Sequence, residues 1–290
     1  DHRDSTMTGP ETRQGQVTLV GTVHRSPESR ARVVSAVRER DPDVVAVELD
    51  PLLFGVYWNG ERLTARRLYR EGATLRGVAL SLVSSRRRRP VGLGGTVSEK
   101  ESLAETDLLS AIREAEKRDA RVALVDRSFV VTLNRLAEEL LSASTLRTLV
   151  GLVRRPERRG PHLDRIDGFV DALLDLGLDA EERRRNPLAW FEGLTEDETA
   201  SLVSAFEAAF PVYGRIEIRE RDRHIAGKLQ WLREEGEDVV AVLGKGHVAG
   251  VEAYLRDPET IPESAIAAPL SPPRRPAAPP QPRRRRRNID

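Results

Sequence analysis

The sequence predicts an α/β fold: a single domain with a mainly parallel sheet flanked by helices. Short apolar runs rich in Val recur along the chain with helical patterns between them, at residues 17–20, 44–47, 121–125 and 238–243. The run at 44–47 is apolar at every position, as in a strand that is buried on both faces. A strand, a helix and a second strand within about thirty residues form a βαβ unit, whose two strands are parallel.

Local signals bound the helices between these runs. Ser26-Pro27 predicts a helix start, because Ser is a good N-cap and Pro suits the first helical position. Asp41-Pro42 ends that helix, since the residue before Pro avoids the α conformation. Thr195-Glu-Asp-Glu198 is a capping-box pattern that opens a later helix. Apolar spacing predicts further helices over residues 107–118, 132–153, 164–177, 214–235 and 247–255. Several of them lie between the third and the last strand, so we expect a helical insertion there.

Composition predicts the domain boundaries. We expect the α/β domain to cover residues 16–257, after a flexible polar leader at 1–15. Residues 258–290 are rich in Pro and Arg and cannot bury enough apolar surface, so we expect a disordered tail. Residues 84–106, with four consecutive Arg and a Gly-rich stretch, are typical of a mobile loop or lid.

Charge and residue usage exclude several classes of protein. The net charge is +1, but residues 271–290 hold seven Arg and one Asp, so the rest of the chain is mildly acidic. An acidic body does not favour nucleic-acid binding. The chain contains no Cys, which excludes disulfides, thiolate metal sites and a Cys nucleophile and fits a cytoplasmic protein. No apolar run approaches the roughly 18–20 residues that span a bilayer.

Polar residues follow the carboxyl ends of all four strands. Gly21-Thr-Val-His24 follows the first strand and Gly244-Lys-Gly-His247 the last, while Glu48 and Asp126-Arg127 follow the second and third. A lone Gly-x-x-His turn is more often a helix-capping turn, and a strand-end carboxylate more often forms a cap or an ion pair. Because ligands of parallel α/β sheets bind beyond the carboxyl ends of the strands, the coincidence favours a single site.

The residue types at this edge favour metal-assisted chemistry. His24, Glu48 and His247 are two imidazoles and a carboxylate, a common three-ligand set that leaves positions open for water. A bound metal lowers the pKa of that water toward neutrality and polarises a carbonyl group. The sequence lacks the Gly-x-Ser-x-Gly motif of serine hydrolases, the His-Glu-x-x-His motif of zincins and the Gly-x-Gly-x-x-Gly motif of dinucleotide-binding proteins.

A second polar cluster lies on the helix expected at 214–235, at Glu217, Glu220-Arg-Asp222 and His224. One interpretation is an exposed face on which Glu217 and Arg221 pair at i, i+4. In the other, Arg221 points inward and binds a carboxylate through two hydrogen bonds. Helical periodicity does not decide between them.

Together, these residues resemble the TraB/PrgY pheromone-shutdown family, within the wider TraB/Tiki group. The resemblance implies a fold like that of erythromycin-esterase-type proteins and ChaN haem-binding proteins. The segments that carry it are Val17-Thr-Leu-Val-Gly-Thr-Val-His24 with Ser26-Pro-Glu-Ser29, Pro42-Asp-Val-Val-Ala-Val-Glu-Leu-Asp50, Leu124-Val-Asp-Arg127 with Thr132-Leu-Asn-Arg135, Glu220-Arg-Asp222 with Ile225-Ala226, and Val240-Ala-Val-Leu-Gly-Lys-Gly-His-Val-Ala-Gly250.

The resemblance also implies an activity. Tiki relatives are regarded as metal-dependent peptidases that use two Gly-x-x-His turns, a Glu and an Arg. The corresponding residues here would be His24, His247, Glu48 and Arg221. PrgY-like relatives sequester or degrade peptide pheromones. We therefore expect a hydrolase of peptides with Mn, Co or Zn at His24, Glu48 and His247. Glu48 is either a ligand or the general base. Arg221 would bind a substrate carboxylate or the developing oxyanion, and Arg127 would support it.

Two alternatives stay open: an inert peptide-binding protein with the same pocket, and haem binding through His24 or His247, which rests on fold analogy alone. The chain departs from the family at residues 84–106, which lack a Gln-Arg and Pro-Gly-containing segment of microbial members. An Arg-rich tail also stands where many microbial relatives have a membrane region. We expect a cytoplasmic protein or the soluble domain of a membrane-anchored one, and the peptide, the metal and the oligomeric state stay open.

Overall fold

The computed structural model describes residues 13–86, 106–154, 160–176 and 187–272. Four strands in these residues form one sheet, namely β1 (Val17–Thr22), β2 (Val44–Val47), β3 (Arg121–Leu124) and β4 (Val239–Gly244). All neighbouring strands are parallel, which confirms the prediction, and their order is β1-β4-β2-β3. The last of these strands along the chain therefore lies between the first two.

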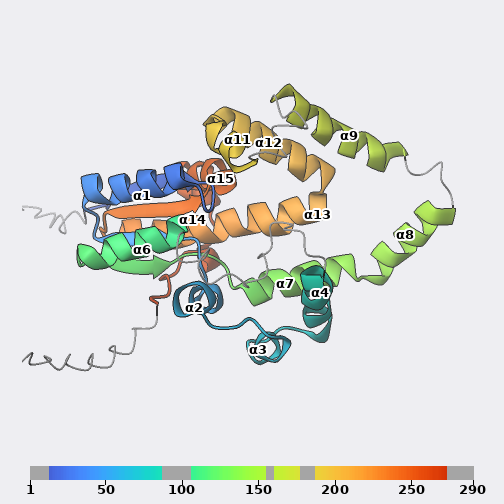
Figure 1. Cartoon of the computed structure of the whole chain (residues 1–290), viewed down its shortest axis with the longest axis horizontal. Helices are drawn as coiled ribbons and strands as arrows, with labels where there is room; N and C mark the ends of the chain where they lie inside the picture. The colour runs from blue at the N-terminus through green and yellow to red at the C-terminus, as the bar shows by residue number, and fades with distance from the viewer. Residues whose placement is uncertain (1–12, 87–105, 155–159, 177–186, 273–290) are drawn as a thin grey trace, which may run out of the picture.

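Helices cover both faces of the sheet (Figure 1). One face packs against α1 (Pro27–Arg40) and α6 (Asp107–Lys117), and the other against α14 (Glu220–Glu234) and α15 (Lys245–Arg256). Successive residues of a strand point to opposite faces, so Val45 and Ala46 of β2 belong to two different cores. This two-sided burial explains the unbroken apolar run at 44–47.

The helix signals act as the sequence predicts. The Ser26 side chain caps α1, Pro27 is its first residue, and the helix ends at Asp41 in the left-handed conformation (φ 44°). Thr195 and Glu198 form both hydrogen bonds of the capping box that opens α12 (Glu196–Ala209).

A helical insertion separates β3 from β4 and extends away from the sheet (Figure 1). The helix expected over 132–153 is two helices, and the one expected over 214–235 begins as a π-helix, whose wider turn the 3.6-residue pattern does not reveal. No helix in the described ranges is long and apolar enough to cross a membrane. Besides α12, the elements of the insertion are α7 (Phe129–Leu140), α8 (Ala143–Arg154), α9 (Gly160–Asp175), α11 (Pro187–Gly193), α13 (Pro211–Tyr213) and η2 (Gly214–Arg219).

In the described part of the segment between β2 and α6 lie three helices that no signal considered above predicts. They are α2 (Pro51–Asn59), α3 (Ala65–Arg70) and α4 (Leu75–Arg86). The loop or lid expected over 84–106 overlaps the end of α4, and residues 87–105 of it lie outside the described residues.

Past the boundary expected at Asp257, the structure describes the next fifteen residues, 258–272. Ile261 is buried in the core beneath α14 and α15, and the Leu270 carbonyl accepts a hydrogen bond from Leu124 N at 2.8 Å. Two short 3-10 helices flank Ile261 in the chain: η3 (Pro258–Thr260) precedes it and η4 (Glu263–Ala265) follows it. One apolar side chain and one backbone pairing outweigh the polar composition of this segment. Residues 273–290 of the expected tail and most of the expected leader, 1–12, lie outside the described residues.

Candidate functional site

The carboxyl edge of the sheet brings together side chains that follow different strands. Glu48 lies at its centre, because β2 pairs with β4, and the Glu48 side chain is 5% exposed. Glu48 Oε2 accepts a hydrogen bond from Gly244 N at 2.5 Å, and Glu48 Oε1 lies 3.4 Å from His247 Nε2. The segments after β2 and β4 therefore meet at one carboxylate.

Each of the two histidines that end the Gly-x-x-His turns contacts its own buried aspartate. His247 Nδ1 lies 2.5 Å from Asp222 Oδ1, and His24 Nδ1 lies 3.2 Å from Asp107 Oδ2. Thr22 Oγ1 also donates a hydrogen bond to Asp107, which fixes the carboxylate in turn. These contacts occupy Nδ1 and leave Nε2 of each ring as the nitrogen for the site.

The three expected ligands surround the space beside Gly244. A Cβ atom built on Gly244 would lie 3.2 Å from Glu48 Oε2, 3.6 Å from His247 Cδ2 and 3.7 Å from His24 Nε2. The backbone of Gly244 has an ordinary φ of −56°, so the close approach of these side chains, and not the backbone angle, favours Gly here. His24, Glu48 and His247 thus lie within reach of one point.

Arg221 points into this site, as the second interpretation of its helix has it. Arg221 Nε and Nη2 donate to the two carboxylate oxygens of Asp126 at 2.9 and 2.8 Å. Nη2 also donates to Glu48 Oε1, and Nη1 lies 3.1 Å from His247 Nε2. One guanidinium therefore joins Glu48, Asp126 and His247.

Charge and burial act against each other at the site. Burial raises the pKa of Glu48, but the positive charges of His247, Arg221 and His24 outweigh it and lower that pKa to about 2. Burial lowers the pKa of His247, but Glu48 and Asp222 outweigh it and raise that pKa overall. The pKa of His24 is also raised, because its contact with Asp107 outweighs burial. Glu48 is therefore ionised throughout the physiological pH range.

Arg127 anchors the helix that carries Arg221. Arg127 Nη2 donates to the Ile216 carbonyl of η2 at 2.9 Å, and Nη1 donates to Glu220 Oε2 at the start of α14. Nε donates to Thr132 Oγ1 at 3.1 Å. The two neighbours Asp126 and Arg127 thus bind different partners: the Asp126 carboxylate binds Arg221, and the Arg127 side chain binds Glu220.

Sequence reasoning assigned no role to Asp107 or Asp222. Asp107 looks like an ordinary acidic residue in the first turn of a helix, and Asp222 belongs to a polar cluster. Both nevertheless lie on buried apolar stripes: Asp107 four residues before Ala111, and Asp222 three residues before Ile225. A carboxylate on the buried face of a helix is the signal that would have found them. Asp50, by contrast, is a cap, since its side chain accepts from Leu53 N.

The donor types at the site fit a divalent metal ion. Two imidazoles held through Nδ1 by carboxylates, with one further carboxylate between them, are a usual set for Mn, Co or Zn. As the side chains stand, no group of three or more His, Cys, Asp or Glu in the described ranges has the arrangement of a metal site. Glu48 Oε1 and His247 Nε2, two of the expected donor atoms, contact Arg221 instead.

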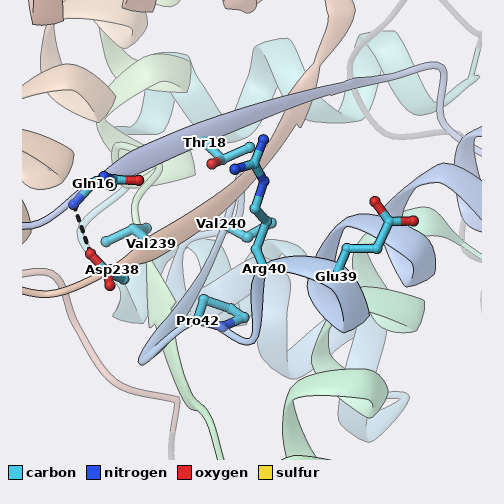
Figure 2. Close-up of a pocket in the computed structure, with 8 residues that line it drawn as sticks. All are labelled: Gln16, Thr18, Glu39, Arg40, Pro42, Asp238, Val239 and Val240. Carbon is cyan, nitrogen blue, oxygen red and sulfur yellow. Dashed lines mark hydrogen bonds between the residues drawn. The ribbon is translucent and has the colours of Figure 1, made fainter.

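A cavity of about 210 Å³ lies at the opposite, amino end of the sheet (Figure 2). One of its two carboxylates, Asp238, already accepts hydrogen bonds from Gln16 N at 3.0 Å and from Arg13 Nη2 at 2.6 Å. The side chains of the carboxyl edge are absent from its lining, so the two places are separate. The lining residues are Gln16, Thr18, Glu39, Arg40, Pro42, Asp238, Val239 and Val240.

Gly250 of α15 provides a test of the Asp222–His247 contact. A Cβ atom on Gly250 would overlap Asp222 Oδ2 and lie 2.8 Å from Asp222 Cγ. We expect Gly250→Ala to displace this carboxylate and to lower the free energy of unfolding by about 1–3 kcal/mol, measured by urea denaturation. Gly246→Ala on the same helix is the control, because its Cβ would meet only Val203 Cγ2 at 3.5 Å. Equal losses in both variants would contradict a specific clash at Asp222.

Comparisons with known proteins point to one family. The model of the TraB/PrgY/gumN family matches residues 8–261. An uncharacterized protein of Methanocaldococcus jannaschii is 25% identical to the chain over 240 residues, which cover 82% of this chain and 53% of that protein. The chain thus spans about half the length of this relative.

Proposed function

The chain belongs to the TraB/PrgY/gumN family, and from this premise we propose that it is a metal-dependent hydrolase of peptides. The observation that carries the proposal is the pair of Asp-held imidazoles, His24 and His247, beside the ionised Glu48. Fixed imidazoles and a charged carboxylate at the carboxyl edge of a parallel sheet are suited to activating water.

The metal ligands in this proposal are Nε2 of His24, Nε2 of His247 and the Glu48 carboxylate. Mn, Co or Zn bound there would polarise a carbonyl group and lower the pKa of bound water. Asp107 and Asp222 hold the two rings with Nδ1 turned away from the site. Glu48 is available as a ligand or as the base that takes a proton from water.

Arg221 supplies positive charge in this mechanism. Burial opposes its charge, but Asp126 and Glu48 outweigh burial and raise the pKa of Arg221 well above its ordinary value. A permanent guanidinium beside Glu48 stabilises negative charge on a substrate carboxylate or on the oxyanion that forms at the scissile carbonyl. Arg127 supports Arg221 by holding η2 and Glu220 in place.

One observation favours a second function, peptide binding without cleavage. Arg221 contacts both Glu48 Oε1 and His247 Nε2, which are atoms that a metal ion would use. If this pairing is permanent, the site is a polar pocket that captures a peptide and leaves it intact.

Incubation with a mixed peptide library separates the two functions. EDTA first removes any bound metal from the protein. Mn or Co is then added to some samples and no metal to the others, and mass spectrometry follows the peptide products. We expect new peptide termini only in the samples with metal. Peptides that are retained on the protein without new termini under every condition would instead establish the binding function.

Metal binding is tested separately by calorimetry. We expect about one divalent ion per chain, and His24→Ala with His247→Ala should weaken its binding at least about 100-fold, because two of three ligands are lost. His162→Ala is the control, since His162 is exposed on α9. Full-strength binding by the double variant would rule out this ligand set.

A further inference from the structure

Glu217 is a buried carboxylate that the mechanism above does not use. It lies in the π-helix η2, one turn before Arg221, and its side chain is 15% exposed. Glu217 Oε1 is buried and has no hydrogen-bond partner among the described residues. Glu217 Oε2 lies 3.9 Å from Arg221 Nη1, which is a looser approach than any other contact of this guanidinium. A buried carboxylate therefore faces Arg221 without being fully paired.

The groups around Glu217 suit it to receive a cation. Burial raises the pKa of Glu217, against the lowering effect of Arg221. The other charged groups that face Glu217 are Asp126, which also raises its pKa, and Arg127 and His247, which lower it. A closer guanidinium would compensate the cost of burying the ionised carboxylate.

Arg221 occupies donor atoms that a metal ion needs. It reaches Glu48 through Nη2 and His247 through Nη1, while Nε and Nη2 hold Asp126. Nη1 can donate a hydrogen bond to His247 Nε2 only when that nitrogen is unprotonated, which is also the form that binds metal. A divalent ion at these atoms would repel the guanidinium. Arg221 must therefore break its contacts with Glu48 and His247 before the ion can bind.

Asp126 and Glu217 are placed to keep Arg221 nearby when this happens. The Asp126 carboxylate can hold the Nε side of the guanidinium through the change, and Nη1, which faces His247, is also the nitrogen nearest to Glu217. A small rotation of the side chain about its Asp126 contact would exchange one partner for the other.

We propose that Glu217 is a positioning residue that receives Arg221 when a divalent cation binds Glu48 and His247. The proposal rests on the metal-dependent function above. It accounts for a site whose donor types fit a metal although Arg221 contacts two of the donor atoms. Glu217 would also keep the positive charge of Arg221 beside the metal, where otherwise the guanidinium would turn into solvent.

The test is calorimetric titration of the whole, EDTA-stripped protein with Mn²⁺ alone. We expect Glu217→Gln, which keeps the shape and removes the charge, to raise the Kd for Mn²⁺ about tenfold. Glu207→Gln is the matched control. Glu207 packs against Gly214 of the same π-helix and pairs with Arg219 at 3.1 Å, so the variant perturbs η2 while Arg221 keeps its partners. Its Kd should stay within about twofold of the parent.

A double-mutant cycle distinguishes positioning from a general structural effect. If Glu217 acts through Arg221, adding Glu217→Gln to Arg221→Gln should change the Kd for Mn²⁺ less than about twofold. If Arg221→Gln does not fold, Arg221→Lys replaces it, because one ammonium cannot hold Asp126 through two hydrogen bonds and also reach Glu217. A tenfold effect that persists in this background, or no effect of Glu217→Gln in the parent, would overturn the proposal. Absence of Mn²⁺ binding by the parent would overturn the metal-dependent function as well.

Discussion

Glu48→Gln is expected to slow metal-dependent peptide cleavage on the order of 1,000-fold while the protein stays folded. The amide keeps the shape of the side chain but removes the negative charge that faces His247, Arg221 and His24. Its NH2 group must also face either Gly244 N or Arg221, both of which are donors themselves. Steady-state kinetics on a peptide identified in the library would measure the loss.

Glu114→Gln on α6 is the matched control for this variant. The Glu114 side chain is 4% exposed, and its hydrogen bond with Arg38 is the main cause that lowers its pKa to about 2, so it resembles Glu48 in burial and ionisation. Since Glu114 faces α1 and not the site, its amide variant should lose some stability and keep activity within about twofold. Similar rates for the two variants would show that Glu48 has no special part in the reaction.

Truncation after Asp257 is expected to lower the free energy of unfolding by about 2–5 kcal/mol, as the loss of a large buried aliphatic side chain does. Ile261 is 4% exposed in the core, so its removal opens a cavity beneath α14 and α15. The truncation also removes Ala265, which packs against Gly227, and leaves Leu124 N without the Leu270 carbonyl. Urea denaturation of the shortened chain, monitored by circular dichroism, measures the change.

Truncation after Pro272 controls for the length of the tail. It retains Ile261, Leu270 and every other contact of this segment that the structure describes, so we expect stability within about 0.5 kcal/mol of the full chain. If both truncations were equally stable, the contacts of residues 258–272 would contribute nothing measurable, and the domain would end at Asp257.

Local patterns are sufficient to predict the strands and the edge at which the candidate residues gather. An apolar run such as 44–47 predicts a buried strand by itself, and a residue that directly follows a parallel strand lies at the carboxyl edge. For that reason the sequence alone predicts that His24, Glu48 and His247 lie together. Such patterns do not predict the orientation of a side chain whose partner lies far away in the sequence.

The remaining features depend on contacts between residues far apart in the chain. Arg221 binds Asp126, which is 95 residues away, and helical periodicity alone does not decide whether Arg221 points inward. Residues 258–272 look disordered when composition is averaged over the whole tail, because Ile261 is the one fully buried residue among them. No local signal indicates that β4 pairs with both β1 and β2.

The position of β4 has a consequence for biosynthesis. Residues 239–244 form a central strand, yet they are translated after all the other strands of the sheet. Until they emerge from the ribosome, β1 and β2 have no common neighbour, and Glu48 lacks Gly244 and His247. A nascent chain or a product of a premature stop codon before residue 220 would also lack Arg221. We therefore expect such incomplete products to lack the assembled site at the carboxyl edge of the sheet.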